Sequence, residues 1–291
     1  PQAISAAQTS VHMTMYILSD HGTIDALIER HQAGVDVKVV LNQSFPGDAT
    51  DSQSNQDVFD QLQGAGVPVV WAPGVFQYTH EKSFVVDGTT AWIMTMNAAN
   101  SSPDDNREYL AIDTIPEHVQ EDEAVFEGDF AGAPVATVDG PLVVAPINAH
   151  TDLDAFVATA KSTIDIEAEE LSDDTFIDAL VAASHAGVAI RVVLPDPNPN
   201  SFNGGHALTS AQQEALTRMK AAAFGLVWIT NPYVHAKTIV VDGTSAYVGS
   251  ANFTYTSLEM NRELGVLFAV EPEIAKITAT INQDFAAGTP F

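Results

Sequence analysis

The sequence predicts a mixed α/β protein made of two similar lobes that follow one another along the chain. Three observations support this fold class: a strand–helix–strand pattern in each half, a ten-residue motif that recurs almost literally, and a Gly-, Ala- and Pro-rich stretch between the halves. Strand–helix–strand units of this length form parallel strand pairs. The chain has 291 residues, which is enough for two packed halves with a sizeable core.

The first strand–helix–strand unit occupies residues 7–41, and residues 160–194 repeat its order. Each unit begins with an alternating strand, continues with a helix and ends in a buried, Val-rich strand. Gly34 and Gly187 stand where the two helices should end, because glycine readily adopts the left-handed conformation that closes a helix. The two units therefore predict one parallel pair of strands in each lobe.

A longer motif follows each unit. His80-Glu-Lys-Ser-Phe-Val-Val-Asp-Gly-Thr aligns with His235-Ala-Lys-Thr-Ile-Val-Val-Asp-Gly-Thr, at an offset of 155 residues between positions 80 and 235. Asn97 aligns with Asn252 at the same offset, and Asn106-Arg-Glu aligns with Asn261-Arg-Glu. Self-similarity of this kind predicts a tandem duplication.

The stretch Asp129–Pro141 is predicted to be the linker between the halves. We therefore place an N-terminal lobe at residues 1–132 and a C-terminal lobe at residues 133–291. The second half begins with a strand-like segment, Pro141–Pro146, for which the first half has no counterpart. Either that edge strand is dispensable or the natural chain is longer.

The motif residues are predicted to converge within each half. His80 and Lys82 share one face of a strand, as do His235 and Lys237, because residues two apart point the same way. Asp87 and Asp242 stand at Asp-Gly hairpin turns, where a carboxylate is better placed to bind backbone groups than substrate.

The returning strand should bring Asn97 or Asn252 back beside the His and Lys of its half. Glu108 and Glu263 follow, and each can bind an imidazole nitrogen and fix its tautomer. Each half thus offers a histidine, a lysine and an amide, with a carboxylate behind them.

Two such sets facing each other suit a phosphodiester. The lysines and amides would stabilise negative charge on the non-bridging oxygens, one histidine would attack phosphorus, and the other would protonate the leaving oxygen and then activate water. This chemistry requires no metal and no cofactor. The chain has no cysteine, which excludes thiolate metal sites and disulfides.

Two sets of other residues have simpler expected roles. The remaining histidines have no partner at ligand spacing and are expected to be surface or structural residues: His12, His21, His31, His118, His150, His185 and His206. The aromatic residues before each motif are expected in the strand core, or alternatively at a substrate mouth that touches lipid: Trp71, Phe76, Tyr78, Trp228 and Tyr233.

The charge balance bears on partners. Asp and Glu number 38 and Lys and Arg only 11, for a net charge of −27. A nucleic-acid groove needs many basic residues, so nucleic acid is an unlikely partner on this composition. No stretch is apolar enough to span a bilayer, and no signal peptide is recognisable. Few lysines and no cysteine favour a secreted or periplasmic protein, and otherwise a soluble cytoplasmic one.

These motifs resemble the phospholipase D superfamily, whose signature is H-x-K-x4-D followed by G-S/T-x-N and a downstream acidic residue. The resemblance covers nearly the whole chain. The second half matches fully with His235, Lys237, Asp242, Gly249-Ser-Ala-Asn252 and Glu263. In the first half Met94 replaces the glycine, while Thr95 and Asn97 keep the hydroxyl and the amide, as Ser250 and Asn252 do.

The resemblance implies an α/β/α/β/α sandwich with pseudo-twofold symmetry and an active site between the lobes. It also implies a metal-free mechanism through a covalent phosphohistidine, with His80 as the nucleophile by analogy with bacterial phospholipases. The symmetry of the sequence itself leaves either histidine open.

The favoured function is a soluble phospholipase D that hydrolyses or transfers the phosphatidyl group. A non-specific nuclease and a catalytically silent binding module are the alternatives. The expected substrate is a zwitterionic phospholipid, because a chain at −27 is repelled by anionic surfaces. We expect a monomer that touches the membrane transiently. The candidate contact is the loop Pro195–Thr209, with Phe202 near its centre, and the alternative is an ordinary surface loop with a buried Phe202.

Overall fold

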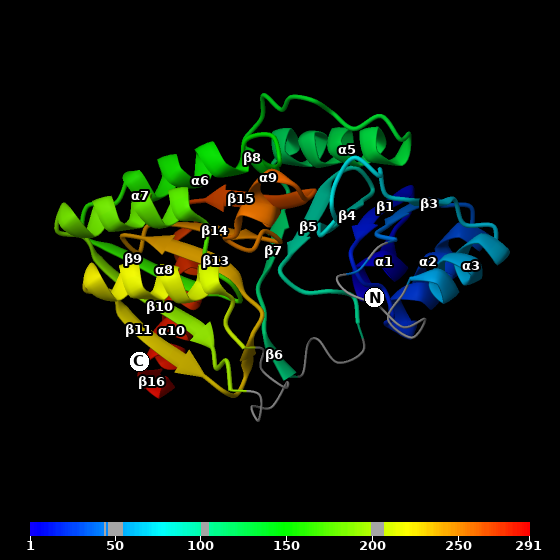
Figure 1. Cartoon of the computed structure of the whole chain (residues 1–291). Helices are drawn as coiled ribbons and strands as arrows, with labels where there is room; N and C mark the ends of the chain where they lie inside the picture. The colour runs from blue at the N-terminus through cyan, green and yellow to red at the C-terminus, as the bar shows by residue number, and fades with distance from the viewer. Residues whose placement is uncertain (44, 46–54, 100–104, 199–206) are drawn as a thin grey trace.

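The computed structural model describes residues 1–43, 45, 55–99, 105–198 and 207–291. The first half of the chain forms one lobe and the second half forms another beside it (Figure 1). The predicted class, two repeated lobes with mixed α/β sheets, is confirmed. Phe202 of the predicted membrane loop lies outside the described residues.

The first lobe contains a six-stranded sheet in the order β3-β2-β1-β4-β5-β7. Its strands are β1 (Ser10–Met15), β2 (Asp36–Leu41), β3 (Val69–Trp71), β4 (Lys82–Val86), β5 (Thr90–Met94) and β7 (Leu110–Asp113). One face packs on α1 (Gln2–Ala6), α2 (His21–Gln32) and α3 (Gln56–Gly64), and the opposite face packs on α5 (Pro116–Phe130).

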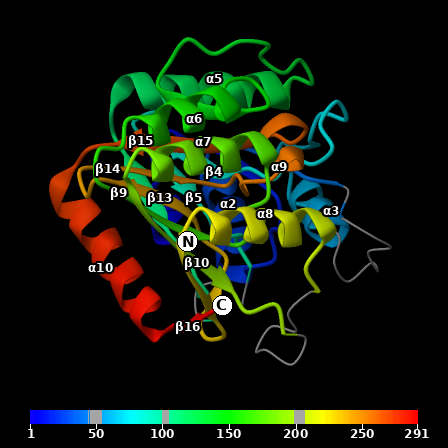
Figure 2. The same cartoon turned by 60° about the vertical axis from the view of Figure 1, so that its left-hand side comes forward.

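The second lobe contains an eight-stranded sheet in the order β16-β11-β10-β9-β13-β14-β15-β8. Its strands are β8 (Leu142–Ala145), β9 (Thr163–Ala168), β10 (Ala189–Pro195), β11 (Gly225–Ile229), β13 (Lys237–Val241), β14 (Ser245–Gly249), β15 (Glu263–Phe268) and β16 (Thr289–Pro290). The outer face packs on α6 (Ala149–Ala158), α7 (Asp174–His185) and α8 (Ser210–Ala221), which lie side by side in Figure 2, and the inner face packs on α10 (Glu271–Ala287). The short helix α9 (Tyr255–Glu259) follows β14.

The two inner faces meet through β5, β14 and β15, with α5 and α10 beside them. This gives the layer order that the sequence motifs implied. A two-stranded sheet of β6 (Asn106–Arg107) and β12 (Tyr233–Val234) joins the lobes directly.

The repeated units form the parallel pairs that were predicted. β1 pairs with β2 and β9 pairs with β10, both in parallel. Asp20 and Asp173 begin the intervening helices by accepting a hydrogen bond from the backbone N–H three residues later. Gly34 and Gly187 follow the ends of these helices at φ values of 89° and 97°, which only glycine adopts without strain.

Antiparallel hairpins carry the motif residues in both lobes. β4 pairs with β5 and β13 pairs with β14 across the Asp-Gly turns. Asp87 and Asp242 have positive φ values of 55° and 52°, as tight hairpin turns of this type require.

The segment between the lobes differs from its prediction in one respect. Helix α5 continues to Phe130, so Asp129 belongs to its last turn and is 1% exposed instead of standing in a linker. The strand predicted at Pro141–Pro146 is β8, which pairs with β15.

Across the described residues, no helix is both long and apolar enough to cross a membrane.

Candidate active site

Backbone pairing between the lobes positions the two histidines. The segment before His235 forms β12, which pairs with β6, and His235 N donates to Arg107 O at 3.2 Å. In the same way, His80 N donates to Arg262 O at 2.9 Å. Each histidine is therefore anchored beside the Asn-Arg-Glu segment of the other half.

This pairing exchanges the carboxylates between the lobes. His80 Nδ1 lies 3.1 Å from both carboxylate oxygens of Glu263, and His235 Nδ1 lies 2.7 Å from Glu108 Oε1. The sequence placed each carboxylate behind the histidine of its own half, whereas the structure places it behind the histidine of the opposite half. A carboxylate at Nδ1 holds the proton on that nitrogen and leaves Nε2 for the substrate.

A hydroxyl and an amide fix each of these carboxylates. Thr95 Oγ1 donates to Glu108 Oε2 at 2.5 Å, and Ser250 Oγ donates to Glu263 Oε2 at 2.6 Å. The asparagines of the two Asn-Arg-Glu segments donate to the same carboxylates at 3.3 and 3.1 Å. The two glutamates are 4% and 1% exposed, so their orientation is set by these bonds.

The two lysines are buried beside their histidines. Lys82 Nζ donates to His80 O at 2.5 Å, and Lys237 Nζ donates to His235 O at 2.7 Å. Burial, together with the like charge of Lys237, lowers the pKa of Lys82 to about 7. Burial likewise lowers the pKa of His80, which favours the neutral imidazole near pH 7.

The two asparagines differ in their surroundings. Asn97 Oδ1 accepts from Ile17 N at 3.3 Å. Asn252 Nδ2 lies 3.4 Å from Glu169 Oε2, and within the described part of the chain Asn252 Oδ1 is buried without a hydrogen-bond partner. The structure thus brings His80, Lys82, His235, Lys237 and Asn252 together at the junction of the lobes, while the described hydrogen bond of Asn97 lies within the first lobe.

Sequence reasoning missed Glu169. Its carboxylate accepts from Lys237 Nζ at 2.8 Å and lies 3.5 Å from His235 Nε2. Burial acts in the opposite direction, but the charges of His235 and Lys237 hold the pKa of Glu169 well below its usual range. Its position in the sequence could have indicated it, because Glu169 directly follows strand β9 in the second lobe as Tyr16 directly follows strand β1 in the first.

Tyr16 gives the first lobe a different environment. Its ring lies 4.4 Å from the His80 ring, and Lys82 Nζ lies 4.9 Å from its centroid. An aromatic ring therefore stands in the first lobe where a carboxylate stands in the second. The two halves of the site are symmetric in their motifs and asymmetric in charge.

Asp87 and Asp242 bind backbone at the outer end of each hairpin. Asp87 accepts from the N–H groups of residues 8, 9 and 10 at 2.6–3.1 Å. Asp242 accepts from those of residues 161, 162 and 163 at 2.7–2.9 Å. Both carboxylates thus fasten the hairpin to the start of the neighbouring strand, away from the histidines.

Replacing Asp242 by asparagine is expected to lower the free energy of unfolding by about 1–3 kcal/mol, because charge-assisted bonds to three N–H groups are weakened. Backbone and hydroxyl hydrogen bonds outweigh the effect of burial and lower the pKa of Asp242 to about 2. Its contribution is therefore present above the unfolded pKa near 4 and is lost as the pH falls towards 2. Urea unfolding at pH 7 and at pH 2 measures both effects.

Asp139→Asn is the matched control, since Asp139 also precedes a glycine but is exposed. If the two variants unfold alike at pH 7, or if the Asp242→Asn protein is fully stable but inactive, the structural role is wrong.

Two arginines also cross between the lobes. Arg262 donates to Asp129 through Nε and Nη2 at 2.8 and 3.1 Å, and Arg107 donates to Asp284 at 2.5 and 3.0 Å. Arg262 and Asp129 are 0% and 1% exposed, while Arg107 is 25% exposed. These bidentate pairs hold each Asn-Arg-Glu segment against the opposite lobe.

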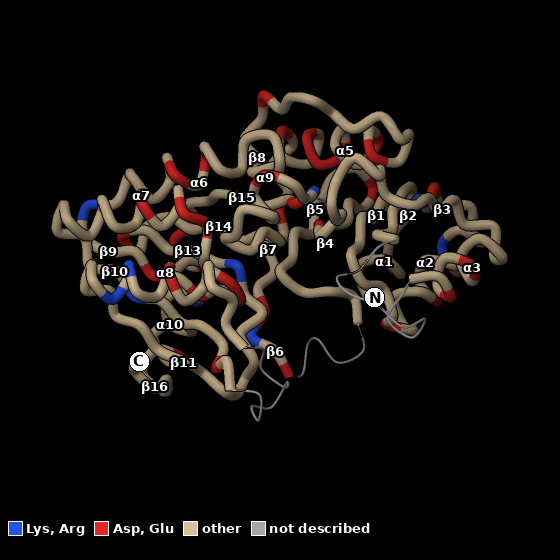
Figure 3. The backbone as a smooth tube through the Cα atoms, in the orientation of Figure 1, with Lys and Arg blue, Asp and Glu red and all other residues tan. Residues whose placement is uncertain are grey.

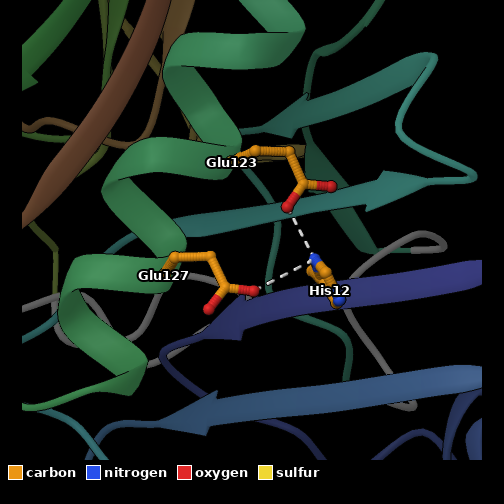
Figure 4. A group of neighbouring side chains, drawn as sticks. All are labelled: His12, Glu123 and Glu127. Atoms are coloured by element: carbon orange, nitrogen blue, oxygen red, sulfur yellow. Dashed lines mark hydrogen bonds and ion pairs between the residues drawn. The ribbon is translucent and has the colours of Figure 1, made fainter.

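One further group of ionisable side chains lies outside the site. His12 Nδ1 is 2.6 Å from Glu123 Oε2 and 4.0 Å from Glu127 Oε1 (Figure 4). Lys38 Nζ already bonds Glu127 at 2.7 Å, so a cation occupies this group without a metal. Among the described residues it is the one cluster with metal-ligand geometry, and we interpret it as an ion-pair network. His12 was expected to lack such partners because they lie far away in the sequence.

The chain matches known proteins along most of its length. The family model described as "Cardiolipin synthase, PLD-like domain" matches residues 1–130 and 153–287. The chain is 24% identical over 331 residues to the "Probable cardiolipin synthase YwiE" of Bacillus subtilis, with 97% of this chain and 62% of that protein covered. It is 34% identical over 110 residues to "Phospholipase D Z" of Dictyostelium discoideum, with 37% and 24% covered. The chain thus spans at most 62% of the length of these relatives.

Solved structures with the same fold include a phosphatidylserine synthase from Haemophilus influenzae. It has a TM-score of 0.72 at 12% identity and covers 100% of this chain and 84% of its own. A polyphosphate kinase from Porphyromonas gingivalis has a TM-score of 0.71 at 16% identity, with 96% and 43% covered. At these identities the likeness concerns the fold alone.

Proposed function

The chain belongs to the phospholipase D superfamily, and we propose that it is a phosphodiesterase that cleaves or transfers the phosphatidyl group of phospholipids. Membership confirms the resemblance found in the motifs. The observation that supports the activity best is the exchange of carboxylates, which leaves Nε2 of both His80 and His235 for one substrate between the lobes.

We assign His80 as the nucleophile on the asymmetry of the site. His80 has a lowered pKa because it is buried, and a neutral imidazole keeps the lone pair that attack requires. His235 Nε2 lies 3.5 Å from Glu169 Oε2, so this nitrogen faces a carboxylate rather than an aromatic ring, and we assign the proton transfers to His235. This agrees with the role that the family resemblance implied for the first histidine.

The reaction would proceed in two balanced steps. His80 Nε2 forms a bond to phosphorus while the bond from phosphorus to the leaving oxygen breaks, and His235 gives its Nε2 proton to that oxygen. His235 then takes a proton from water or an alcohol, whose oxygen bonds to phosphorus as the bond to His80 breaks. Water gives hydrolysis, and an alcohol gives transfer.

The lysines and asparagines would stabilise the charge on the non-bridging oxygens. The anion also restores the ammonium form of Lys82, since a nearby negative charge raises a pKa that burial has lowered. No metal is needed at any step.

Within the superfamily, we propose a phospholipid substrate in preference to a nucleic acid. Several relatives carry the name cardiolipin synthase, so transfer stands beside hydrolysis. Lys and Arg are few and scattered among many Asp and Glu (Figure 3), which disfavours the nuclease alternative. A silent binding module would keep the fold and bind without turnover.

Cleavage of bis-p-nitrophenyl phosphate and phosphatidylcholine is expected to continue unchanged in EDTA, because the protein's own side chains supply the charge stabilisation. Rates with and without EDTA measure this, and glycerol added to the lipid assay separates transfer from hydrolysis. Single- and double-stranded DNA are the control substrates. Activity that EDTA abolishes and a divalent ion restores would refute the mechanism, and rapid DNA cleavage without lipid turnover would favour the nuclease.

A further inference from the structure

A small pocket opens beside the catalytic centre in the second lobe. It has a volume of about 160 Å³. Its wall is formed by Glu169–Leu171, by residues 194–197 at the end of β10, by residues 207–209, by Gln212 and Leu216 of α8, and by Trp228 and Tyr233. Pockets for drug-sized ligands are usually about 300 Å³ or larger, so this one admits only a small group.

Among the described residues of the wall, the charged ones are all acidic. Glu169, Glu170 and Asp196 line the pocket, and no Lys or Arg of the described chain does so. Asp196 accepts from Asn198 N and Thr230 Oγ1, at 2.9 and 3.0 Å. The half-buried Glu170 carboxylate has no hydrogen bond shown within the described residues, and burial and the charge of Glu169 raise its pKa. Such a wall favours a cation and disfavours an anion.

Two aromatic side chains complete the lining. Trp228 is held by stacking on Phe291, with centroids 3.7 Å apart, and Tyr233 is held by a hydrogen bond from its hydroxyl to Glu169 Oε1 at 3.0 Å. Rings fixed beside carboxylates are the combination that binds organic ammonium groups. Trp228 lies in β11 and packs against the core as expected for a strand residue, and both Trp228 and Tyr233 also line this pocket.

Glu169 belongs to the pocket and to the catalytic centre at once. Its Oε2 is bonded to Lys237 and lies near Asn252 Nδ2, which are two of the groups that would hold the phosphate oxygens. A phosphate bound at these donors would compete with Glu169 for them, which weakens the bond between Glu169 and Lys237. A cation in the neighbouring pocket would then neutralise the Glu169 carboxylate.

We propose that this pocket binds the ammonium headgroup of the substrate, with Glu169 and Glu170 as its counter-ions and Trp228 and Tyr233 as its aromatic walls. The inference rests on the proposed function, since it names the substrate class of the same site. The acidic and aromatic side chains of the pocket would select choline or ethanolamine headgroups over glycerol. This selection adds to the repulsion of anionic surfaces by the net charge.

Binding measured without turnover tests the pocket by itself. Choline and its uncharged isostere 3,3-dimethylbutan-1-ol are titrated into the full chain by calorimetry. Choline should bind and the isostere should bind about tenfold more weakly or not at all. Glu170→Gln should weaken choline binding about five- to tenfold. Glu214→Gln, an equal change of charge at an exposed position of α8, should leave it unchanged. Equal binding of the two ligands, or equal effects of the two variants, would overturn the proposal.

Turnover of short-chain lipids below their micelle concentration then removes the membrane surface from the comparison. Dihexanoyl phosphatidylcholine should be cleaved at least about tenfold faster than dihexanoyl phosphatidylglycerol, and Glu170→Gln should reduce that ratio. A ratio near one, with bis-p-nitrophenyl phosphate still cleaved, would overturn the headgroup pocket and leave the proposed function intact. Choline that binds to a protein inactive on every diester would overturn the proposed function instead.

Discussion

Replacing either His80 or His235 by alanine is expected to reduce phosphodiester cleavage by about 10⁴- to 10⁶-fold. The loss should be large for both variants, because attack by one histidine and proton transfer by the other act on the same phosphate. Initial rates on phosphatidylcholine, with circular dichroism to confirm folding, measure the effect. His185→Ala, at an exposed position of α7, is the matched control and should keep full activity.

The two variants together test whether the lobes share one site. A His235→Ala protein with more than about a tenth of the wild-type rate would mean that each half works alone. The exchange of Glu108 and Glu263 between the lobes argues against that outcome, since the carboxylate at Nδ1 of each histidine comes from the opposite half.

Replacing Arg262 by methionine is expected to lower the free energy of unfolding by about 3–5 kcal/mol. The substitution leaves the Asp129 carboxylate, 1% exposed, without the partner that compensates its burial. It also removes the bond to Ala145 O at 3.1 Å and the contact with the Phe76 ring. Urea unfolding followed by circular dichroism measures the change.

The second ion pair between the lobes, Arg107–Asp284, supplies the control. Arg107→Met should cost less than Arg262→Met, because Arg107 is 25% exposed and water can solvate what remains. The double variant Arg262→Met/Asp129→Leu should recover part of the loss, since no buried charge is left unpaired. An Arg262→Met protein that is as stable as Arg107→Met would contradict the assigned role of the buried pair.

Much of the fold follows from local signals in the sequence. Gly34 and Gly187 end helices, and the Asp-Gly pairs at Asp87 and Asp242 turn hairpins, because only a few residue types tolerate positive φ. These signals depend on neighbouring residues, so they can be read directly. The duplication then doubles each of them, which explains why the two-lobed class was predictable.

The partners across the lobe junction could not be found in this way. Glu263 meets His80 across 183 positions and Glu108 meets His235 across 127, and both contacts depend on how the lobes pack. Asp129 was placed in a linker for the same reason, because its arginine partner lies 133 positions away. Glu169 was missed because the repeat replaces it with Tyr16 in the first lobe, which hides it from a search for shared residues.

We propose that His80 attacks phosphorus while His235 donates a proton to the leaving oxygen and later accepts one from water. In the His235→Asn variant, His80 should still attack bis-p-nitrophenyl phosphate and carry the nitrophenyl phosphoryl group, because p-nitrophenolate leaves without needing a proton. The adduct should then persist, because no base is left to activate water. We expect a burst of about one p-nitrophenolate per chain. Alkaline quenching and peptide mass spectrometry should place the nitrophenyl phosphoryl group on His80, and His80→Asn should give no burst. An adduct on His235, or a burst from His80→Asn, would contradict the account.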